Sequence, residues 1–357
     1  MQRRKHEEIP AEGGLVMWAL VYHGPNDLRY EQIPTPVPGP GEVLVAVKAV
    51  GVCGSDVHGY LGITGRRIPP MVMGHEFAGE VAEVGPDVEG VEVGTKVAVQ
   101  PLVFCGQCGQ CRQGNTNLCV ESRFLGVLTT NGAMAEYVVV PAKQLFPLPE
   151  GLGFAEGALV EPAAVALRAI KKLGDRPMPE RVAIIGAGPI GLLLLQYVKL
   201  RGAKEVLMTD LEDYRLDLAQ ELGADIVLNP KETDVIMRAQ DWTEGEGVPL
   251  AIEAVGATPT VQQAMAMVGL RGTVLWVGNS ARFVEVNMQQ AVTREYTILG
   301  TFIYNHEEFG EALEDIGAGR VKVKPLLSRS YPLSQGPELF ATLAEGKEQI
   351  IKAVLTI

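Results

Sequence analysis

The residues best suited to chemistry in this sequence are its five cysteines, and four of them lie close together. Cys105, Cys108, Cys111 and Cys119 follow the spacing C-x2-C-x2-C-x7-C. Four thiolates at short spacing form a closed metal cage, which is typical of a structural zinc site because all ligand positions are filled by protein. Cys53 lies outside this group and is free for another role.

Disulfide bonds and an iron–sulfur cluster are the alternatives to zinc for the four cysteines. Disulfides need an oxidising compartment, and the first residues, MQRRKHEE, lack the apolar stretch of a signal peptide. Ferredoxin-type motifs also open with C-x2-C-x2-C, but they close after three residues with a cysteine that precedes proline. Here the last gap is seven residues and Val120 follows Cys119, so the spacing favours zinc.

A second group of possible metal ligands accompanies Cys53. His75 and Glu76 are adjacent, and Glu161 lies in an apolar stretch where a carboxylate is costly unless it is paired or binds a metal. Catalytic zinc takes about three protein ligands and keeps one position open. Cys53 and His75 are suitable sulfur and nitrogen ligands, and Glu76 or Glu161 can supply the oxygen. Glu161 could instead be a helix N-terminal acid stabilised by the helix dipole.

A glycine-rich turn predicts a dinucleotide site. Gly186-Ala187-Gly188-Pro189-Ile190-Gly191 follows a buried strand predicted over 181–185 and opens a helix. Its glycines allow a tight turn, a close approach to a pyrophosphate and close packing of the helix on the strand. Asp210 ends the next strand, where a carboxylate binds the ribose hydroxyls and repels a 2′-phosphate, so NAD is predicted over NADP. Arg215 could lie beside the adenine or neutralise Asp210.

The bulk properties set limits on the class of protein. A chain of 357 residues exceeds the size of one hydrophobic core, so two domains are expected. The net charge of −12 argues against nucleic-acid and anionic-membrane binding, which need a positive field. No run of eighteen apolar residues is present, so no membrane span is expected. We expect a cytoplasmic protein that acts on a small molecule.

The predicted elements change in type along the chain. Short strands separated by glycine and proline dominate up to about residue 149, and one helical stretch is predicted over 151–173. From 181 to about 299 strands and helices alternate, which indicates a parallel sheet with helices on both faces. Residues 1–16 are expected to be a loosely held extension before a first strand that opens at Met17.

Together the motifs resemble those of the zinc-dependent medium-chain alcohol dehydrogenase family, in particular its polyol (sorbitol-like) dehydrogenase branch. The matching segments are Cys53-Gly54-Ser55-Asp56-Val57-His58, Gly74-His75-Glu76-Phe77-Ala78-Gly79, the four cysteines, Glu161-Pro162, and the glycine motif with Asp210. The resemblance implies an α/β protein in which a Rossmann doubly wound parallel-sheet domain (157–299) is inserted into a GroES-like β-rich catalytic domain (17–156 and 300–357).

The resemblance also implies a reaction: hydride transfer from a secondary alcohol, diol or polyol to NAD, which gives a ketone. Zinc lowers the pKa of a bound hydroxyl and so favours loss of the hydride. By analogy with the family, Ser55 takes the alcohol proton and passes it through the cofactor ribose to His58. Val277 and Lys352 are expected to contact the cofactor, with Lys352 at its pyrophosphate. Relatives are dimers or tetramers, so a homo-oligomer is expected.

Substrate walls in this family imply roles for Tyr60, Phe124 and Tyr304. Ile303 stands where sorbitol-type enzymes carry arginine, and this departure favours a smaller or less polar secondary alcohol, such as a vicinal diol. Two alternatives stay open: an L-threonine dehydrogenase-like enzyme, and a non-catalytic NAD-binding relative of the same fold.

Overall fold

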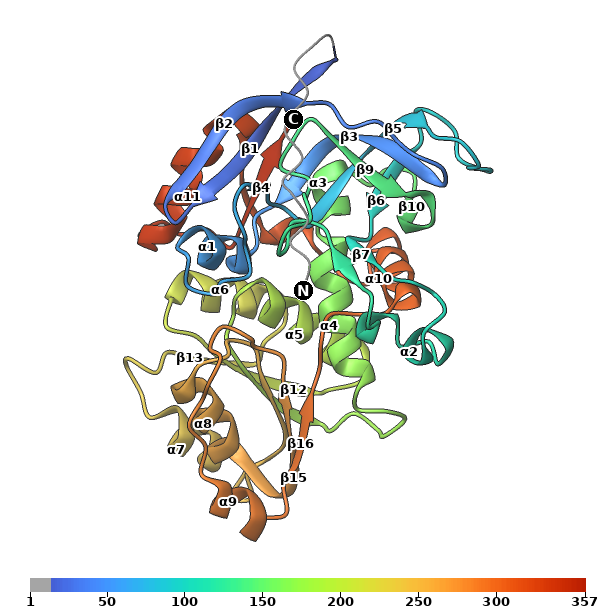
Figure 1. Ribbon diagram of the computed structural model, residues 1–357. Coiled ribbons are helices and arrows are strands. Elements are labelled where there is room, and N and C mark those ends of the chain that lie inside the picture. The colour runs from blue at the N-terminus through green and yellow to red at the C-terminus, as the bar shows by residue number, and fades with distance from the viewer. Residues whose placement is uncertain (1–13) are drawn as a thin grey trace, which may run out of the picture.

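The computed structural model describes residues 14–357 and divides into a β-rich part and an α/β part, above and below in Figure 1. Most of the predicted N-terminal extension, residues 1–13, lies outside the described residues. The first strand, β1 (Val16–Gly24), opens one residue before the predicted Met17. No helix of the described chain is both long and apolar enough to cross a membrane.

The β-rich part is built around β3 (Glu42–Gly51), whose side chains are buried along most of its length. β3 pairs with three antiparallel strands, including β18 (Lys352–Thr356), which brings the end of the chain beside an early strand. The sheet runs in the order β10-β6-β5-β3-β18-β17, with β9 also pairing with β3. Its other strands are β5 (Glu76–Val84), β6 (Lys96–Val99), β9 (Tyr137–Pro141), β10 (Leu145–Pro147) and β17 (Leu327–Pro332).

The α/β part is a six-stranded parallel sheet of order β13-β12-β11-β14-β15-β16. Its central strand β11 (Arg181–Ile185) is a continuous apolar run that helices cover on both faces, as burial of a parallel strand requires. The other strands are β12 (Glu205–Thr209), β13 (Ile226–Leu228), β14 (Val248–Glu253), β15 (Val268–Trp276) and β16 (Thr297–Gly300). β11 matches the boundaries predicted for it residue for residue, and β12 ends at Thr209, directly before Asp210.

The helical stretch predicted over 151–173 is two helices, α3 (Phe154–Ala158) and α4 (Val160–Lys171). Leu159, with ψ near 0°, ends the first helix and begins the second. The break places Glu161 in the first turn of α4. The remaining α-helices are α1 (Gly54–Tyr60), α2 (Gly109–Arg112), α5 (Pro189–Leu200), α6 (Asp213–Glu221), α7 (Val235–Trp242), α8 (Thr258–Met267), α9 (Met288–Thr293), α10 (His306–Gly317) and α11 (Gly336–Glu345).

Short elements complete the fold. A separate small sheet joins β2 (Asp27–Pro34), β1 and β4 (Met71–Val72), and β7 (Leu102–Val103) pairs with β8 (Arg123–Phe124). The 3-10 helices are η1 (Thr116–Leu118), η2 (Ala142–Gln144), η3 (Lys324–Leu326) and η4 (Leu333–Gln335).

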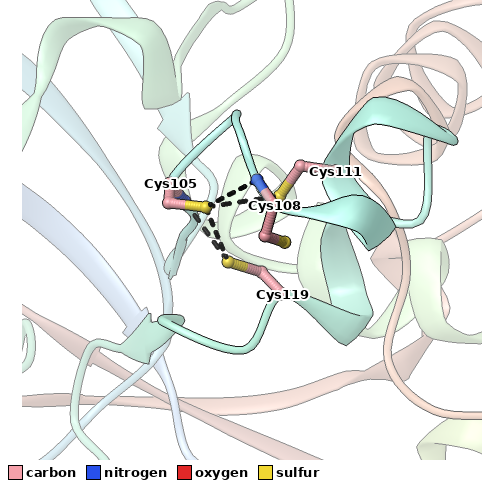
Figure 2. A group of neighbouring side chains, drawn as sticks. All are labelled: Cys105, Cys108, Cys111 and Cys119. Atoms are coloured by element: carbon pink, nitrogen blue, oxygen red, sulfur yellow. Dashed lines mark hydrogen bonds between the residues drawn. The ribbon is translucent and has the colours of Figure 1, made fainter.

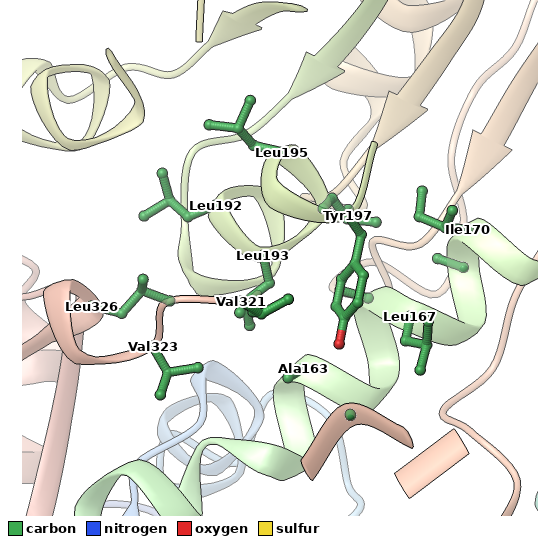
Figure 3. Packing of buried hydrophobic residues seen from close by; sticks show 14 of the residues in the cluster. Ala163, Leu167, Ile170, Leu192, Leu193, Leu195, Tyr197, Val321, Val323 and Leu326 are labelled. Carbon is green, nitrogen blue, oxygen red and sulfur yellow. The ribbon is translucent and has the colours of Figure 1, made fainter. Parts of the chain in front are cut away.

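One hydrophobic core connects the two parts of the molecule. Side chains of α4 and α5 pack against residues 321–326, which return toward the β-rich part (Figure 3). The same cluster includes Ala49 of β3 and Ala98 of β6. The Arg168–Glu308 ion pair, at 3.0 Å, joins α4 to α10 beside this core. The segments that carry the candidate site are therefore held in one packed interior.

Candidate metal and cofactor site

The Cys53 group meets at the ends of three elements. Cys53 is the N-cap of α1, directly after β3, while His75 and Glu76 lie at the start of β5. One potential ligand atom from each of these three residues lies within 4.8 Å of the others, a metal-sized cluster. Glu161 of α4 lies beyond that cluster but near enough for its charge to act on His75. The structure thus brings together three of the four residues predicted for a catalytic metal, with Glu161 nearby but outside the cluster.

The missing side chain at Gly51 of β3 leaves the space that the carboxylate of Glu76 occupies in this cluster. A Cβ atom at Gly51 would overlap the Oε2 atom of Glu76, because the two residues are paired across β3 and β5. A larger residue at position 51 would displace the carboxylate from Cys53 and His75. The glycine is therefore part of the site, although it carries no chemistry of its own.

Glu76 forms a buried ion pair with Lys352. The lysine Nζ lies 2.8 Å from both carboxylate oxygens and 3.2 Å from the carbonyl oxygen of Val52. Burial opposes the charge of Lys352, but Glu76 and Cys53 outweigh it and raise the pKa of the lysine. The ammonium group of Lys352 faces the metal cluster, where it neutralises Glu76, a contact that was not predicted. The predicted contact of Lys352 with the cofactor pyrophosphate stays a prediction.

His75 is positioned by a carboxylate that is itself paired. Its Nδ1 lies 3.5 Å from Oδ1 of Asp56, which accepts a 2.7 Å hydrogen bond from Arg67. Burial disfavours the anion, but the charges of His75 and Arg67 hold the pKa of Asp56 well below its usual range. Because Nδ1 faces Asp56, Nε2 is left for a metal, the usual arrangement of a metal-binding histidine. Arg67 and this role of Asp56 were not predicted.

Glu161 is buried and bonded to a second buried group. Its Oε1 accepts a 3.0 Å hydrogen bond from the hydroxyl of Tyr304, which is fully buried. Burial raises the pKa of Glu161 to about 7, and Glu76 adds to the rise while His75 opposes it. Tyr304 was predicted as a substrate wall. The structure instead makes it a support for Glu161, because its ring is packed in the core.

The other residues predicted for the site lie on α1 and on β8. Phe124 of β8 lies beside the Cys53 cluster, with its ring 5.7 Å from that of His75. Tyr60 was also predicted as a substrate wall, but it is a core residue whose ring packs edge-on against Phe340, so this prediction is corrected. Ser55 is exposed and His58 is partly exposed, one helical turn apart on α1.

The chemistry of this cluster fits a cation. The partly buried thiol of Cys53 and the buried carboxylate of Glu76 lie within 4.8 Å of each other, the carboxylate of Glu161 lies nearby, and buried Lys352 offsets Glu76. In the absence of a metal, burial lowers the pKa of His75, but Asp56 and Cys53 raise it well above 6.5 overall. Cys53, His75 and Glu76 can hold zinc with one position open, and Glu161 lies beside them.

The four-cysteine lobe also fits a metal. Potential ligand atoms of Cys105, Cys108, Cys111 and Cys119 all lie within 4.8 Å of one another (Figure 2). Backbone N–H groups point at the sulfurs: Cys105 N donates to Cys119 at 3.3 Å and Cys108 N donates to Cys105 at 3.4 Å. Backbone hydrogen bonds from Cys111 and Val120 lower the pKa of Cys108 to about 6. Such N–H donors stabilise the thiolates that zinc requires.

The glycine motif borders a cleft of about 520 Å³ between the two parts of the molecule. Gly188 is the N-cap of α5 and Pro189 its first residue, so the helix N-terminus opens toward the cleft. A Cβ at Gly191 would overlap the carbonyl oxygen of Gly186, which explains the third glycine. Ile190 lies in the first turn of the helix, and Val277 follows β15 at the same edge of the sheet.

The adenosine end of this cleft contains Asp210. Its two oxygens accept backbone N–H groups of Ala187 at 2.8 Å and Glu212 at 3.0 Å. Arg215 lies 3.7 Å from Asp210 and also lines the cleft, so both positions suggested for it from the sequence are compatible with the geometry. Residues 346–350 form the opposite wall.

Known proteins share these features along nearly the whole chain. The family model "Alcohol dehydrogenase GroES-like domain" matches residues 39–150, and "Zinc-binding dehydrogenase" matches residues 189–318. The 2-dehydro-3-deoxy-L-galactonate 5-dehydrogenase of Pseudoalteromonas atlantica is 35% identical, with 95% of this chain and 98% of that protein covered. The chain belongs to the zinc-dependent alcohol dehydrogenase family. It is therefore a dehydrogenase that uses zinc and a nicotinamide dinucleotide, which confirms the predicted family and fold class.

Other relatives and solved structures agree. Sorbitol dehydrogenase of Bacillus subtilis is 34% identical over 95% of this chain and 97% of its own length. The structure of 2R,3R-butanediol dehydrogenase from Bacillus subtilis has a TM-score of 0.85 and 33% identity, covering 96% and 99% of the two chains. A zinc-binding dehydrogenase from Sinorhizobium meliloti, bound to NADP, has a TM-score of 0.88 and 32% identity, covering 96% and 100%.

Proposed function

We propose that this dehydrogenase oxidises a secondary hydroxyl group of a neutral diol or polyol and reduces NAD. The observation that carries the proposal is the metal-sized cluster of Cys53, His75 and Glu76, with Glu161 beside it. Cys53, His75 and Glu76 would hold zinc, which would supply an electrophile for a substrate hydroxyl, and the cleft would hold NAD as the hydride acceptor. Relatives are named for sorbitol and butanediol, which are neutral, and for a deoxy sugar acid, so they support a hydroxylated carbon chain as substrate, and the proposed neutrality rests on the charge pairing described next.

Charge pairing in the site supports a neutral substrate. Arg67 and Lys352 are the buried cations beside the cluster in the described chain, and each is paired with a carboxylate. Neither is free to bind the carboxylate of an amino acid such as threonine. A carboxylate-bearing substrate would have to compete with Asp56 or Glu76 for its cation, at the cost of an unpaired buried charge. This argument favours diols and polyols over the threonine alternative.

Proton removal is assigned to α1. We propose that Ser55 accepts the alcohol proton and that His58, one turn further along the helix, passes it to solvent. Serine can donate and accept hydrogen bonds at the same time. Arg67 Nη2 lies 3.4 Å from Ser55 Oγ, a contact that supports a fixed position for the hydroxyl.

The preference for NAD is proposed from Asp210. Its carboxylate is held in place by two backbone N–H groups, where it would face a 2′-phosphate on the ribose. Arg215 lies 3.7 Å from the Asp210 carboxylate and partly offsets its charge, but the carboxylate keeps its position in the cleft.

We also propose the domain boundaries given by the resemblance, with residues 17–156 and 300–357 forming the catalytic domain. Pairing of β18 with β3 supports them. A homo-oligomer is proposed through the edge strand β16, since exposed apolar side chains occur in it and in the segments on either side: Phe283, Met288, Val292, Ile298 and Phe302. The five free cysteines support a reducing, cytoplasmic location.

The first test of function is NADH formation with sorbitol, xylitol, 2,3-butanediol, 2-propanol and L-threonine, before and after treatment with EDTA. We expect turnover with the diol or the polyols, loss with EDTA and recovery with zinc. Glu76→Gln should lower the rate of NADH formation by about 10–100-fold, because it weakens metal binding. Glu121→Gln, at an exposed position, should leave the rate unchanged. NAD binding without turnover on any alcohol would favour the non-catalytic alternative.

Cofactor choice is tested by Asp210→Ser. Loss of the charged hydrogen-bond acceptor should shift the NAD-to-NADP ratio of kcat/KM toward NADP by about 10–100-fold, which corresponds to about 1.5–3 kcal/mol. Asp217→Ser, on the exposed side of α6, is the matched control and should leave the ratio unchanged. An unaltered ratio in Asp210→Ser would remove Asp210 from cofactor discrimination.

The proton path is tested by His58→Ala. Alcohol oxidation should slow by about tenfold or more at low pH, where loss of the proton to solvent is least favourable, and less at high pH. The measurement is kcat against pH for the variant and the parent. An identical profile in both would show that His58 takes no part.

The oligomer is tested by Ile298→Lys on β16. A charge on the edge strand should prevent pairing between copies, so light scattering should report a smaller mass than for the parent. Ile63→Lys, at another exposed position, is the control and should leave the mass unchanged. A parent that is already monomeric would contradict the proposal.

A further inference from the structure

The four-cysteine lobe touches the catalytic centre through one short segment. Residues 302–306, here called the strap, connect β16 to α10 and carry Tyr304 in the middle. The side chain of Asn117 donates a 2.9 Å hydrogen bond to the carbonyl oxygen of Phe302. The N–H of His306 donates a 3.0 Å hydrogen bond to Oγ1 of Thr116. The lobe therefore holds the strap on both sides of Tyr304.

The two lobe residues are directed inward. Thr116 and Asn117 form η1 between Cys111 and Cys119, and they are 8% and 4% exposed, whereas the next residue, Leu118, is 48% exposed. A polar side chain is buried at low cost only where it is hydrogen-bonded. Metal binding by the cysteines on either side of η1 would fix the position of both side chains.

A third contact strengthens the same connection. The ring of His306 lies between Phe104 and Phe146, at centroid distances of 5.5 and 5.0 Å, and its Nδ1 is 2.7 Å from Oε1 of Gln100. Phe104 directly precedes Cys105, the first cysteine of the lobe. The C-terminal end of the strap is thus packed against the root of the lobe.

Strain in the strap indicates that these contacts hold it in place. Ile303 has a φ of +38°, a left-handed conformation that a β-branched residue rarely adopts. Such a conformation persists only where the surrounding contacts impose it. It lies between Phe302, held by Asn117, and Tyr304, whose hydroxyl donates to Glu161 at 3.0 Å.

We propose that Thr116 and Asn117 are positioning residues for the catalytic centre. By holding the strap, they fix the hydroxyl of Tyr304, which in turn fixes Glu161 beside the Cys53 cluster. The four-cysteine lobe then does more than maintain its own shape, because its order sets the position of a carboxylate at the reacting centre. The inference rests on the proposed function only in taking the Cys53 cluster as a zinc site.

The test compares Asn117→Ala with Asn115→Ala. Asn115 is in the same lobe, and its side chain bonds to Gln110 rather than to the strap, so it is a matched control. Two properties are measured in the metal-loaded protein: the rate at which the catalytic metal is lost to EDTA, and the visible spectrum with cobalt at the catalytic site. Asn117→Ala should lose the metal up to about tenfold faster and shift the spectrum, and Asn115→Ala should do neither.

A double-mutant cycle separates positioning from general damage. Tyr304→Phe removes the hydroxyl that meets Glu161 and should speed metal loss about 10–100-fold. If Asn117 acts through Tyr304, Asn117→Ala should add little in that background. Equal effects of Asn117→Ala and Asn115→Ala, or additive effects with Tyr304→Phe, would overturn the proposal.

If Asn117→Ala also releases the metal bound by the four cysteines, its effect on the catalytic metal is indirect. A second pair of variants, at Thr116, controls for this outcome. Thr116→Val removes the acceptor for the His306 N–H at nearly constant volume, and Thr116→Ser keeps it. Metal loss should be faster in Thr116→Val and near the parent rate in Thr116→Ser, and equal rates would contradict the proposal. Metal retention needs no turnover, so this result stands apart from the outcome of the alcohol panel.

Discussion

The buried ion pair between Lys352 and Glu76 is the contact on which the arrangement of this molecule depends. Both side chains are almost fully buried, and they join β18, at the end of the chain, to β5, across β3. Removal of one partner from such a pair costs about 3–5 kcal/mol, since the other charge is left unpaired in the interior. The lysine also bonds to the carbonyl of Val52, directly before Cys53. One ammonium group thus fixes the carboxylate, the backbone at the thiol and the C-terminal strand.

The same rule accounts for the other charges near the cluster. Asp56 is paired with Arg67 and faces His75, and Glu161 is bonded to Tyr304. Asp56 and Glu161 therefore each have a partner that also fixes their position, and rigidity follows from the need to satisfy buried polar and charged groups. The excess of anionic ligand groups that remains is the feature that a divalent cation would balance. The pairing of buried groups therefore determines both the side-chain positions and the net negative charge of the Cys53 cluster.

Motifs that act within one turn or loop could be predicted from the sequence. The four cysteines and the glycine motif work through neighbours in the chain, and Asp210 follows from the end of a strand whose boundary was clear. Arg67, Lys352 and Tyr304 were missed or misplaced because their partners lie 11, 276 and 143 residues away. A lone lysine or tyrosine carries no local signal of such a partner. The break between α3 and α4 at Leu159 was also missed, because the residues on either side of it have high helix propensity and no local signal marks the break.

The cofactor cleft and the metal cluster are joined by a single short segment. Residues 346–350 line the adenosine end of the cleft, and the carbonyl oxygen of Ile350 lies 3.5 Å from the hydroxyl of Tyr214 on α6. Two residues later Lys352 begins β18 and pairs with Glu76. A residue that lines the cleft and the lysine that pairs with Glu76 therefore lie two positions apart, where the chain enters β18. Because β18 is hydrogen-bonded to β3, the position of this segment is set by the same sheet that presents Cys53, so one rigid element holds both the cleft wall and the metal cluster.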